Sequence, residues 1–312
     1  MNNVECLIVS STIDYATDLI CVELLNRNKN YLRINRDCFN QYSVIYSLDK
    51  DEIVLCIDGE QYLLSNMYLK SIYFRAPVFI RSNKAYSIDE QLYRSQWSSF
   101  LRNLVVFDKA KWMNHPVNTY LSENKIYQLK MAKSEGLLTP KTFVCNALPK
   151  EIENGKNYIV KSLDTALFYD NQYEYFTYSI KKKGSELSQC SINDAPVILQ
   201  ECLENKIDLR ITVVGNVLFP VSIENNFGGI DGDWRKTRKE DLRYRTIELP
   251  KEIQNGLRVL VSKLGLVFAG IDMAFIDGDY YFVEANPTGE WAWLQNALGI
   301  RIDKAIVDYL TG

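Results

Sequence analysis

The sequence predicts an α/β protein built from two or three lobes. Near the N-terminus, a strand-like run from Val4 to Ser10 is followed by a helix-like run from Asp14 to Asn26 and a second strand-like run from Tyr31 to Asn35, an alternation typical of α/β units. Near the C-terminus, two short apolar runs enclose a turn that contains glycine, which indicates a β-hairpin. At 312 residues, the chain is long for one compact unit and can bury an ample core.

Composition excludes several classes of protein. Hydrophobic content of 47% and charged content of 24% are ordinary for globular proteins and exclude a disordered or collagen-like chain. A formal net charge of -3 gives no general attraction to nucleic acid or anionic membranes. The N-terminus has no basic region followed by a long apolar core, and no stretch is long and apolar enough to span a bilayer. We therefore expect a soluble, cytoplasmic protein without a nucleic-acid or membrane partner.

Cysteine and histidine usage narrows the possible chemistry further. The seven cysteines are scattered and never approach a C-x-x-C spacing, which indicates a reducing compartment and no zinc site. The only histidine, His115, precedes Pro116 in a predicted loop. Catalytic triads and histidine-ligated metals are therefore not expected.

The first third of the chain continues as short strands and one long helix. The expected strands are Tyr42 to Ser47, Glu52 to Ile57, Glu60 to Leu64 and Ser71 to Phe74. No glycine-rich phosphate loop follows any of them, so a Rossmann-type dinucleotide site is not expected. The run from Ser87 to Asn103 predicts the long helix, and we expect the N-terminal lobe to end near Pro116.

A lysine in an apolar strand is the main feature of the next segment. A helix capped by Ser122 and ending at Gly136 is expected first, followed by a strand from Lys141 to Cys145. The strand from Tyr158 to Leu163 then carries Lys161 in the middle of an apolar run. Burying an ammonium group is costly unless it meets an anion, so Lys161 predicts a phosphate site. A lysine whose amine reaches out to water is the alternative.

Two further strands are predicted to pair with one another, Pro196 to Glu201 and Asp208 to Val214. Between them they carry four polar candidates: Gln200, Glu201, Asp208 and Arg210. Asp208 and Arg210 are two positions apart and so share a face of the strand. They could form a simple ion pair or take part in catalysis.

Two segments leave their role open. The stretch from Asp164 to Ser191 is rich in Tyr and Phe and then basic, which fits strands over a nucleotide or a plain antiparallel sheet. The stretch from Phe227 to Tyr244 reads as a loop with Asp233-Trp234-Arg235, followed by a basic run that includes Arg238 and Lys239. Such runs are usually solvated, although this one could receive an acidic partner. Two amphipathic helices follow, from Glu252 to Leu264 and from Asp303 to Leu310.

The C-terminal hairpin places two acids opposite one another. Its apolar runs flank Asp277-Gly278-Asp279. A three-residue loop would set Ile276 opposite Tyr280, Ala274 opposite Phe282 and Asp272 opposite Glu284, all on the acidic face. The expected apolar face consists of Ile271, Met273, Phe275, Tyr281 and Val283. A two-residue loop would instead separate the two acids.

Opposed carboxylates predict a metal site. Directly opposed side chains have Cβ atoms roughly 5 Å apart, and like charges so placed are destabilising unless something neutralises them. Asn286 lies two residues beyond Glu284 on the same face. Asp272, Glu284 and Asn286 thus offer the oxygen ligands that Mg²⁺ prefers, with room for phosphate oxygens. An amphipathic hairpin with solvated acids is the alternative.

Taken together, these residues resemble the ATP-grasp ligases. The resemblance rests on Lys125 at a helix start, Lys161 in a strand, Gln200-Glu201 followed by Asp208 and Arg210, and finally Asp272, Glu284 and Asn286. It covers roughly Ser122 to Trp291 and is strongest in D-L-R-I-T-V-V-G, G-I-D-M and F-V-E-A-N-P-T-G. It implies an ATP-grasp fold with an N-terminal α/β pre-ATP-grasp domain (1–116), a central lobe (117–195) and a C-terminal lobe with the Mg²⁺ site (196–312).

Within that superfamily, the chain is similar to the graspetide synthetases typified by microviridin ligases. E-N-K-I-Y-Q-L-K-M-A, the D-W-R tripeptide and E-A-N-P-T-G-E-W carry this likeness. Such enzymes use ATP and Mg²⁺ to activate Asp or Glu side chains of a precursor peptide as acyl phosphates, which a Ser or Thr hydroxyl or a Lys amine attacks to close an ester or amide. Glutamate ligases that modify a ribosomal protein share the same motifs. One departure is the absence of glycine from Thr165 to Tyr178, where many ATP-grasp enzymes have a glycine-rich loop.

The resemblance assigns expected roles. ATP would be bound by Lys125, Lys161, Gln200, Asp208 and the adenine hinge Glu201, Cys202 and Leu203. Mg²⁺ would be bound by Asp272, Glu284 and Asn286. Arg210 and Arg235 would be catalytic by stabilising the γ-phosphate and the acyl phosphate. The peptide would contact Asp233, Trp234, Arg238 and Lys239.

The expected partner is a precursor peptide with a leader and an acidic core, and the expected assembly is a homodimer. Two other functions remain open. The first is a carboxylate-amine ligase that adds amino acids to a protein tail or a small molecule, and the second is a catalytically silent nucleotide- or peptide-binding module.

Overall fold

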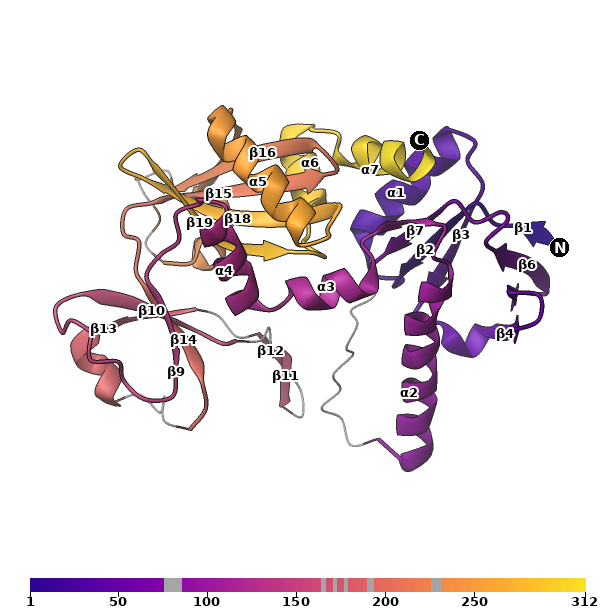
Figure 1. Ribbon diagram of the computed structural model, residues 1–312, viewed down its shortest axis with the longest axis horizontal. Coiled ribbons are helices and arrows are strands. Elements are labelled where there is room, and N and C mark those ends of the chain that lie inside the picture. Colours follow the sequence, from indigo (N-terminus) through magenta and orange to yellow (C-terminus); the bar gives the residue numbers. More distant parts are fainter. Residues whose placement is uncertain are drawn as a thin grey trace.

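The computed structural model describes residues 1–75, 86–163, 167–170, 173–176, 179–189, 194–225, 230 and 232–312. Within these residues, the strands form four larger sheets and one isolated hairpin (Figure 1). The helices lie between and beside the sheets, so the α/β class expected from the sequence is confirmed.

A parallel sheet lies near the N-terminus, with strand order β3-β2-β7-β8. Its strands are β2 (Cys6–Ser10), β3 (Tyr31–Asn35), β7 (Ser71–Phe74) and β8 (Lys111–Met113). Helix α1 (Tyr15–Asn26) connects the first two strands and begins where the side chain of Asp14 accepts a hydrogen bond from the Thr17 amide. An aspartate at this position satisfies an otherwise unpaired amide at the helix start.

A second N-terminal sheet is mostly antiparallel, with order β1-β6-β5-β4. It comprises β1 (Asn2–Asn3), β4 (Tyr42–Ser47), β5 (Glu52–Ile57) and β6 (Glu60–Ser65), and the long helix α2 (Ile88–Asn103) follows it in the chain. Trp97 of α2 stacks on Phe39 with ring centroids 4.6 Å apart, which ties this helix to the N-terminal core.

Two short helices lead from the N-terminal sheets to the rest of the molecule, α3 (Pro116–Ser122) and α4 (Lys125–Ser134). The predicted cap at Ser122 is wrong, because Ser122 ends α3 and its hydroxyl donates to the Leu264 carbonyl at 3.1 Å. Asn124 precedes α4 instead. Gly136, with a φ of 78°, ends this region as expected, since glycine adopts that conformation without strain.

A four-stranded central sheet has the order β13-β10-β14-β9. Its strands are β9 (Thr142–Cys145), β10 (Asn157–Lys161), β13 (Ile180–Lys183) and β14 (Val197–Glu201). The separate hairpin of β11 (Leu167–Asp170) and β12 (Tyr173–Phe176) falls in the stretch whose role the sequence left open. Residues 164–166, 171–172, 177–178 and 190–191 of that stretch lie outside the described residues.

A five-stranded antiparallel sheet of order β17-β16-β15-β18-β19 occupies the C-terminal part. Its strands are β15 (Ile207–Val214), β16 (Val217–Asn225), β17 (Leu242–Thr246), β18 (Phe268–Ile276) and β19 (Asp279–Asn286). The predicted pairing of the strands ending at Glu201 and Val214 is wrong: β14 pairs with β10 and β9, whereas β15 pairs with β16 and β18. The chain passes from one sheet to the other between Glu201 and Ile207.

The two faces of the five-stranded sheet differ. Helices α4 and α5 (Lys251–Lys263) cover one face and enclose a large apolar core with Leu209, Ile211 and Phe282 (Figure 1). On the other face, Val214 and Phe268 pack in a second core with helices α6 (Ala292–Leu298) and α7 (Ile302–Thr311). The polar side chains of the candidate functional site lie on this second face too, farther along the strands of the five-stranded sheet.

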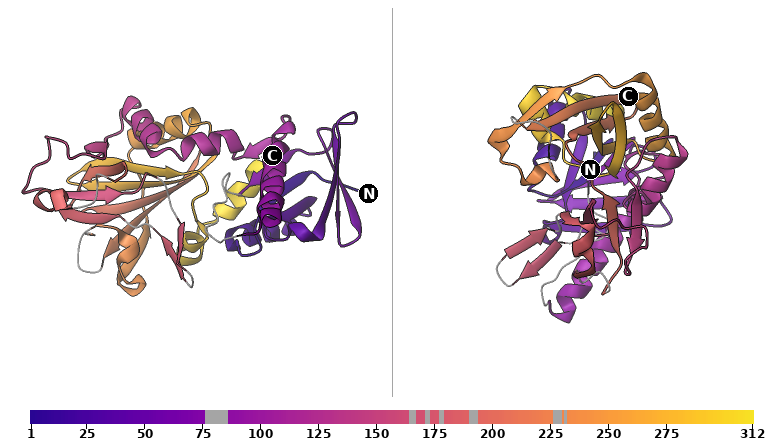
Figure 2. Two further views of the ribbon diagram at one scale, coloured as in Figure 1. Left: turned by 90° about the horizontal axis from the view of Figure 1, so that it is seen from below. Right: turned by 90° about the vertical axis from the view of Figure 1, so that its left-hand side faces the viewer.

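The C-terminal helix returns to the N-terminal part of the chain. Helix α7 lies beside α1 (Figures 1 and 2), and Arg27, which directly follows α1, pairs with Asp308 of α7. Ile306, Val307 and Leu310 are buried in the same cluster as Ile20 and Leu24. The parallel N-terminal sheet and the five-stranded sheet are therefore joined by a shared apolar core.

The turn of the C-terminal hairpin differs from the prediction. Ile276 pairs with Asp279, so the loop has two residues, Asp277 and Gly278, both with positive φ. A register shift between Asp272 and Met273 then accommodates Val283 as an extra residue on β19. This bulge restores the expected pairing of Asp272 with Glu284, because one inserted residue shifts the register by one.

The bulge also changes the faces of β19. Phe282 is fully buried in the apolar core together with Met273 and Ile271, although the sequence placed it on the acidic face. Val283 lines the candidate cavity instead, and Tyr281 pairs with Ala274. The expected core positions for Tyr281 and Val283 are therefore wrong.

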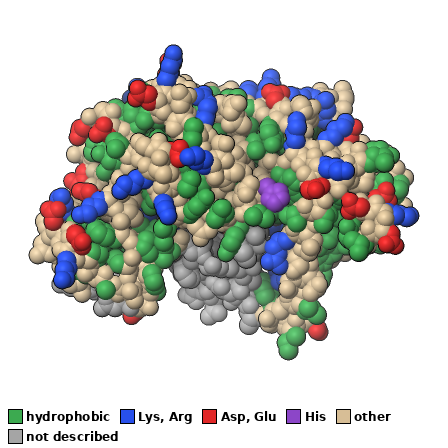
Figure 3. Space-filling model, in the orientation of Figure 1, with side chains coloured by type: hydrophobic (Ala, Val, Ile, Leu, Met, Phe, Trp, Pro, Cys, Tyr) green, Lys and Arg blue, Asp and Glu red, His purple; other side chains and the backbone are tan. Residues whose placement is uncertain are grey.

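The surface in Figure 3 shows positive and negative side chains interspersed with hydrophobic ones on the face in view. Among the helices that the structure describes, none combines the length and hydrophobicity needed to span a lipid bilayer.

Candidate functional site

A cavity of about 200 Å³ lies between the central sheet and the five-stranded sheet. It brings together almost all of the residues singled out in the sequence. These are Lys125, Lys161, Gln200, Glu201, Cys202, Leu203, Asp208, Asp233, Trp234, Arg235, Asp272, Glu284 and Asn286. Arg210 is buried and does not line the cavity itself. Arg238 does not line it either: its side chain is exposed, and its Nη1 lies 3.8 Å from Glu240 Oε1. Lys239 begins a short helical turn (Lys239–Asp241), and its side chain lies outside the described residues.

The acidic wall of the cavity consists of Asp272 on β18 and Glu284 on β19. Arg210 Nη1 donates to Asp272 Oδ1 at 2.8 Å. Burial raises the pKa of Asp272, and the charge of Glu284 raises it further against the opposing effect of Arg210. Burial would also raise the pKa of Glu284, but the nearby charges of Lys161 and Lys125 outweigh it and hold that pKa below its usual value.

Two glycines allow Arg210 to reach Asp272. A Cβ on Gly270 would lie 2.3 Å from Arg210 Nη2, and one on Gly289 would lie 2.5 Å from the same atom. Arg210 Nη2 also donates to the Glu290 carbonyl at 3.1 Å. The glycines of G-I-D-M and N-P-T-G thus leave room for a buried guanidinium.

The ion pair between Asp208 and Arg210, one of the two alternatives that the sequence left open, does not form. Arg210 is committed to Asp272, and Lys206 Nζ donates to Asp208 Oδ1. Burial raises the pKa of Asp208 to about 6 despite the charge of Lys206. Asp208 Oδ2 is buried with no hydrogen-bond partner among the described residues, so this oxygen could accept a hydrogen bond from a ligand.

The opposite wall is basic. Lys161 Nζ donates to Gln200 Oε1 at 2.9 Å, and Gln200 Nε2 donates to Thr142 Oγ1 at 2.9 Å. Lys125 Nζ donates to the Ser162 carbonyl at 3.2 Å. Burial lowers the pKa of Lys161, and the neighbouring Lys125 lowers it too, against the opposing charge of Glu284. Lys161 is therefore held inside the site, which excludes the alternative that its amine simply reaches water.

A third group enters from a short helical turn (Trp234–Lys236). Arg235 Nε and Nη2 donate to the two carboxylate oxygens of Asp233, each at 2.8 Å. Ser179 Oγ donates to the same carboxylate at 3.3 Å. Trp234 packs against Trp293 with ring centroids 5.4 Å apart. Asp233 thus fixes the orientation of Arg235 at the cavity rim.

Solved structures resemble the whole chain, although no protein-family model and no curated protein matches it. The macrocyclase MdnC from Microcystis aeruginosa MRC, bound with precursor peptide MdnA, is 24% identical over 98% of both chains, with a TM-score of 0.82. A Chryseobacterium gregarium RiPP-associated ATP-grasp ligase, in complex with ADP and a leader and core peptide, is 24% identical over 99% of this chain and 96% of that chain, with a TM-score of 0.82.

A more distant match is D-alanine–D-alanine ligase from Bacillus anthracis complexed with ATP. It is 13% identical over 99% of this chain and 96% of that chain, with a TM-score of 0.55. The chain has the ATP-grasp fold. This agreement confirms the fold that the order and spacing of the sequence motifs implied.

Within this ATP-grasp fold, the acidic wall suits a hard divalent cation. Asp272 and Glu284 are paired across the hairpin, and Asn286 Nδ2 donates to Glu284 Oε1 at 3.3 Å, which leaves the Asn286 amide oxygen for another partner. No group of three or more His, Cys, Asp or Glu side chains that could hold a metal occurs in the described part of the chain. The site instead offers two carboxylates and one amide. This set of three ligands fits a cation that also takes oxygens from a bound phosphate.

Several lining residues were missed in the sequence. They are Pro140, Ile159, Ser162, Ser179, Lys206, Gly232, Met273, Ala274 and Val283. A signal existed for Lys206, which lies two positions before Asp208 and can share its face. The apolar residues gave no signal, because Ile159 and Met273 look like ordinary strand positions until the two sheets are placed face to face.

Proposed function

We propose that the chain is an ATP-dependent ligase that macrocyclises a ribosomally made precursor peptide. The observation that carries this proposal is one cavity with lysines on one wall and opposed carboxylates on the other. Such a site can bind a nucleotide by its phosphates and bind a divalent cation between those phosphates and the carboxylates.

In this proposal, Lys125 and Lys161 bind the phosphates, and Asp208 accepts a hydrogen bond from the ribose. The hinge of Glu201, Cys202 and Leu203 and the apolar side chain of Ile159 surround the adenine. Asp272, Glu284 and Asn286 would hold Mg²⁺, which would supply positive charge next to the phosphates.

The proposed reaction has two steps. An Asp or Glu side chain of the peptide attacks the γ-phosphate of ATP, which gives an acyl phosphate and releases ADP. A Ser or Thr hydroxyl or a Lys amine then attacks the acyl carbon, which gives an ester or amide and releases phosphate. The protein contributes proximity and fixed charge rather than a nucleophile of its own.

The two proposed catalytic arginines act differently. Arg235 lines the cavity and can contact developing negative charge directly. Arg210 holds Asp272 from behind, so its contribution passes through that carboxylate. Asp233 and Trp234 lie at the same rim, where a peptide would enter, and the basic residues Arg238 and Lys239 would attract its acidic core.

The structural matches support a peptide substrate. MdnC was solved with precursor peptide MdnA, and the Chryseobacterium ligase was solved with ADP and a leader and core peptide. Both cover nearly all of this chain with higher TM-scores than the D-alanine–D-alanine ligase. We further propose the domain division at 1–116, 117–195 and 196–312, a homodimer and a cytoplasmic location.

Intact mass spectrometry tests the proposal. A candidate precursor peptide encoded beside this gene is incubated with the protein, ATP and Mg²⁺. We expect the peptide to lose the mass of one water for each bond formed. Glu284→Gln should abolish the loss, whereas Asp279→Asn, which removes an exposed acid from the first position of β19, should preserve it.

Other outcomes distinguish the alternatives. A peptide that gains the mass of an amino acid would identify a carboxylate-amine ligase. A protein that binds ATP but changes no acidic peptide of the neighbourhood and releases no ADP would be a silent binding module, which contradicts the proposal.

A further inference from the structure

The loop that follows β19 determines the geometry of the acidic wall. It connects Asn286, the last residue of β19 and a proposed metal ligand, to Trp291, which directly precedes α6. Gly289 and the Glu290 carbonyl contact the guanidinium of Arg210, which in turn binds Asp272. The position of this loop therefore sets both Asn286 and Arg210. The inference below rests on the proposed Mg²⁺–ATP site.

The loop is held by an arginine from the N-terminal parallel sheet. Arg75 follows β7 directly, and its side chain is only 7% exposed. Its Nη2 donates to Glu290 Oε1 at 2.5 Å, and its Nη1 donates to the Gly289 carbonyl at 3.4 Å. One buried guanidinium thus contacts two consecutive residues of a loop more than two hundred positions away in the chain.

Arg75 is itself fixed by the start of α1. Its Nε donates to Asp14 Oδ2 at 2.9 Å. The same carboxylate accepts a hydrogen bond from Ser10 Oγ at 2.8 Å and caps α1 through the Thr17 amide at 3.2 Å. The guanidinium therefore links the start of α1 to the loop between β19 and α6.

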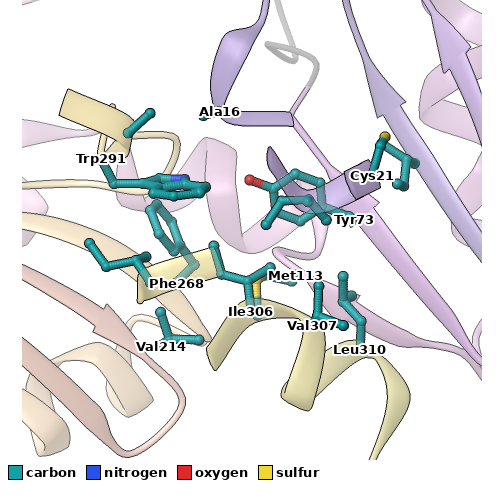
Figure 4. Packing of buried hydrophobic residues seen from close by; sticks show 14 of the residues in the cluster. Ala16, Cys21, Tyr73, Met113, Val214, Phe268, Trp291, Ile306, Val307 and Leu310 are labelled. Carbon is teal, nitrogen blue, oxygen red and sulfur yellow. The ribbon is translucent and has the colours of Figure 1, made fainter. Parts of the chain in front are cut away.

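Two neighbours reinforce the contact. Asn114, which follows β8, donates through Nδ2 to the Pro287 carbonyl at 2.8 Å and to the Phe268 carbonyl at 2.8 Å. Figure 4 shows the buried indole of Trp291 beside Phe268, with the hydroxyl of Tyr73 directed toward it. The ends of two adjacent parallel strands thus hold both ends of the loop.

We propose that Arg75 is a positioning residue for the metal-binding wall. By fixing Gly289 and Glu290, it keeps Arg210 against Asp272 and keeps Asn286 beside Glu284. The role requires an arginine, because three donors in a planar fork serve acceptors on two separate segments, whereas a lysine offers one compact charge. The N-terminal sheet would in this way determine how well the C-terminal wall binds Mg²⁺.

Nucleotide binding tests this role without catalysis. The affinity for ADP is measured by titration calorimetry with and without Mg²⁺ for the wild type, Arg75→Gln and Arg75→Lys. We expect Arg75→Gln to reduce the Mg²⁺-dependent gain in affinity roughly 10-fold, the lower range seen when a residue that orients metal ligands is removed. Binding without Mg²⁺ should stay within about twofold, and Arg75→Lys should fall between the wild type and Arg75→Gln.

Arg33→Gln is the matched control. Arg33 is a partly buried arginine in the middle of β3, in the same sheet, with donors to Asp18, Asn35 and the Ser11 carbonyl. None of these partners belongs to the 286–291 loop. Its loss should lower stability without altering the Mg²⁺-dependent gain.

Hydrogen exchange in the nucleotide-free protein provides a second measurement. The amides of Gly289 and Glu290 should exchange faster in Arg75→Gln and remain unchanged in Arg33→Gln. If Arg75→Gln fails to fold, Glu290→Gln removes only the loop side of the ion pair and should show the same changes to a smaller degree. Wild-type exchange at these amides in a folded Arg75 or Glu290 variant would overturn the inference. If the wild-type protein gained no affinity for ADP from Mg²⁺, the proposed function would be overturned instead. The hydrogen-exchange comparison would still test whether Arg75 fixes Gly289 and Glu290.

Discussion

The two walls of the cavity differ in charge and in how firmly they are built. The acidic wall belongs to a five-stranded sheet backed by a large core. Arg75 and Asn114 hold the loop after β19, and the side chain of Gln128 bonds both backbone groups of Ala285 within β19. On the basic wall, Lys125 comes from α4, whereas Lys161 and Gln200 belong to the central sheet, whose own core consists of Tyr158, Leu187 and Leu199 with a few partly buried neighbours. The metal side is therefore preorganised, while the phosphate side rests on a smaller unit.

The largest expected effect comes from Glu284→Gln on the acidic wall. Without this charge, the proposed Mg²⁺ is poorly held, and ADP formation should fall by roughly 10²- to 10³-fold. Affinity for ATP without Mg²⁺ should stay equal or rise, because a carboxylate that repels phosphate is gone. Turnover and titration calorimetry check both parts, with Asp279→Asn as the control. If Glu284→Gln weakened ATP binding equally with and without Mg²⁺, the distinction between a metal-binding and a phosphate-binding wall would be wrong.

Two leucine truncations test the difference in construction. Leu199 in the central sheet and Leu260 in the large core are both buried to 1% exposure or less. Each Leu→Ala change should lower the free energy of unfolding of the unit that contains it by about 2–5 kcal/mol. We expect Leu199→Ala to accelerate hydrogen exchange mainly in β9, β10 and β14, and Leu260→Ala to lower the main thermal transition. An equal drop of that transition in both variants would mean that the walls unfold together.

Lys161→Met tests the basic wall. It removes the charge that faces Glu284 but keeps the bulk of the side chain, so ATP should bind about 10-fold more weakly, or about 1.4 kcal/mol. The loss should appear both with and without Mg²⁺, in contrast to Glu284→Gln. Lys183→Met, an exposed lysine on the edge strand of the same sheet, is the control. A loss seen only with Mg²⁺ would contradict a direct phosphate contact.

The smallest effect concerns Asp208, whose pKa is raised by burial to about 6. Between about pH 4 and 6, the folded state binds more protons at this group than the unfolded state, so its ionisation lowers stability as the pH rises. The effect of Asp208→Asn on the free energy of unfolding should therefore be more stabilising at pH 8 than at pH 4.5, by about 1 kcal/mol. Urea unfolding of both proteins at the two pH values measures this. If the stability difference between the two proteins were the same at both pH values, Asp208 would titrate alike in the folded and unfolded states, which would contradict the prediction.

Local patterns predicted much of the fold. The bounds of β3, β4, β5 and β7 agree with the sequence, because alternating side chains and turn residues act over a few positions. Asp14 caps α1, and Gly136 ends the region after α4, for equally local reasons. The strands β16 and β17 and helix α6 were missed, because their patterns are weaker and stand next to loops.

The sequence also identified the chemical groups of the site. Lysines and carboxylates in apolar strands stand out because burying a charge is costly without a partner. The pairing of Asp272 with Glu284 was correct, although the predicted loop length was not, since a two-residue turn and the bulge at Val283 compensate. A bulge leaves almost no local signal, so this agreement could not have been secured from the sequence.

By itself, then, the sequence determined the fold class, the order of most elements and the residue types that meet in the cavity. Only the tertiary structure decided which strands share a sheet, that Arg210 serves Asp272 rather than Asp208, and that Arg75 holds the loop behind them. The physical reason is distance along the chain. Periodicity and turns are set by neighbouring residues, whereas these partners are chosen by the packing of whole sheets against one another.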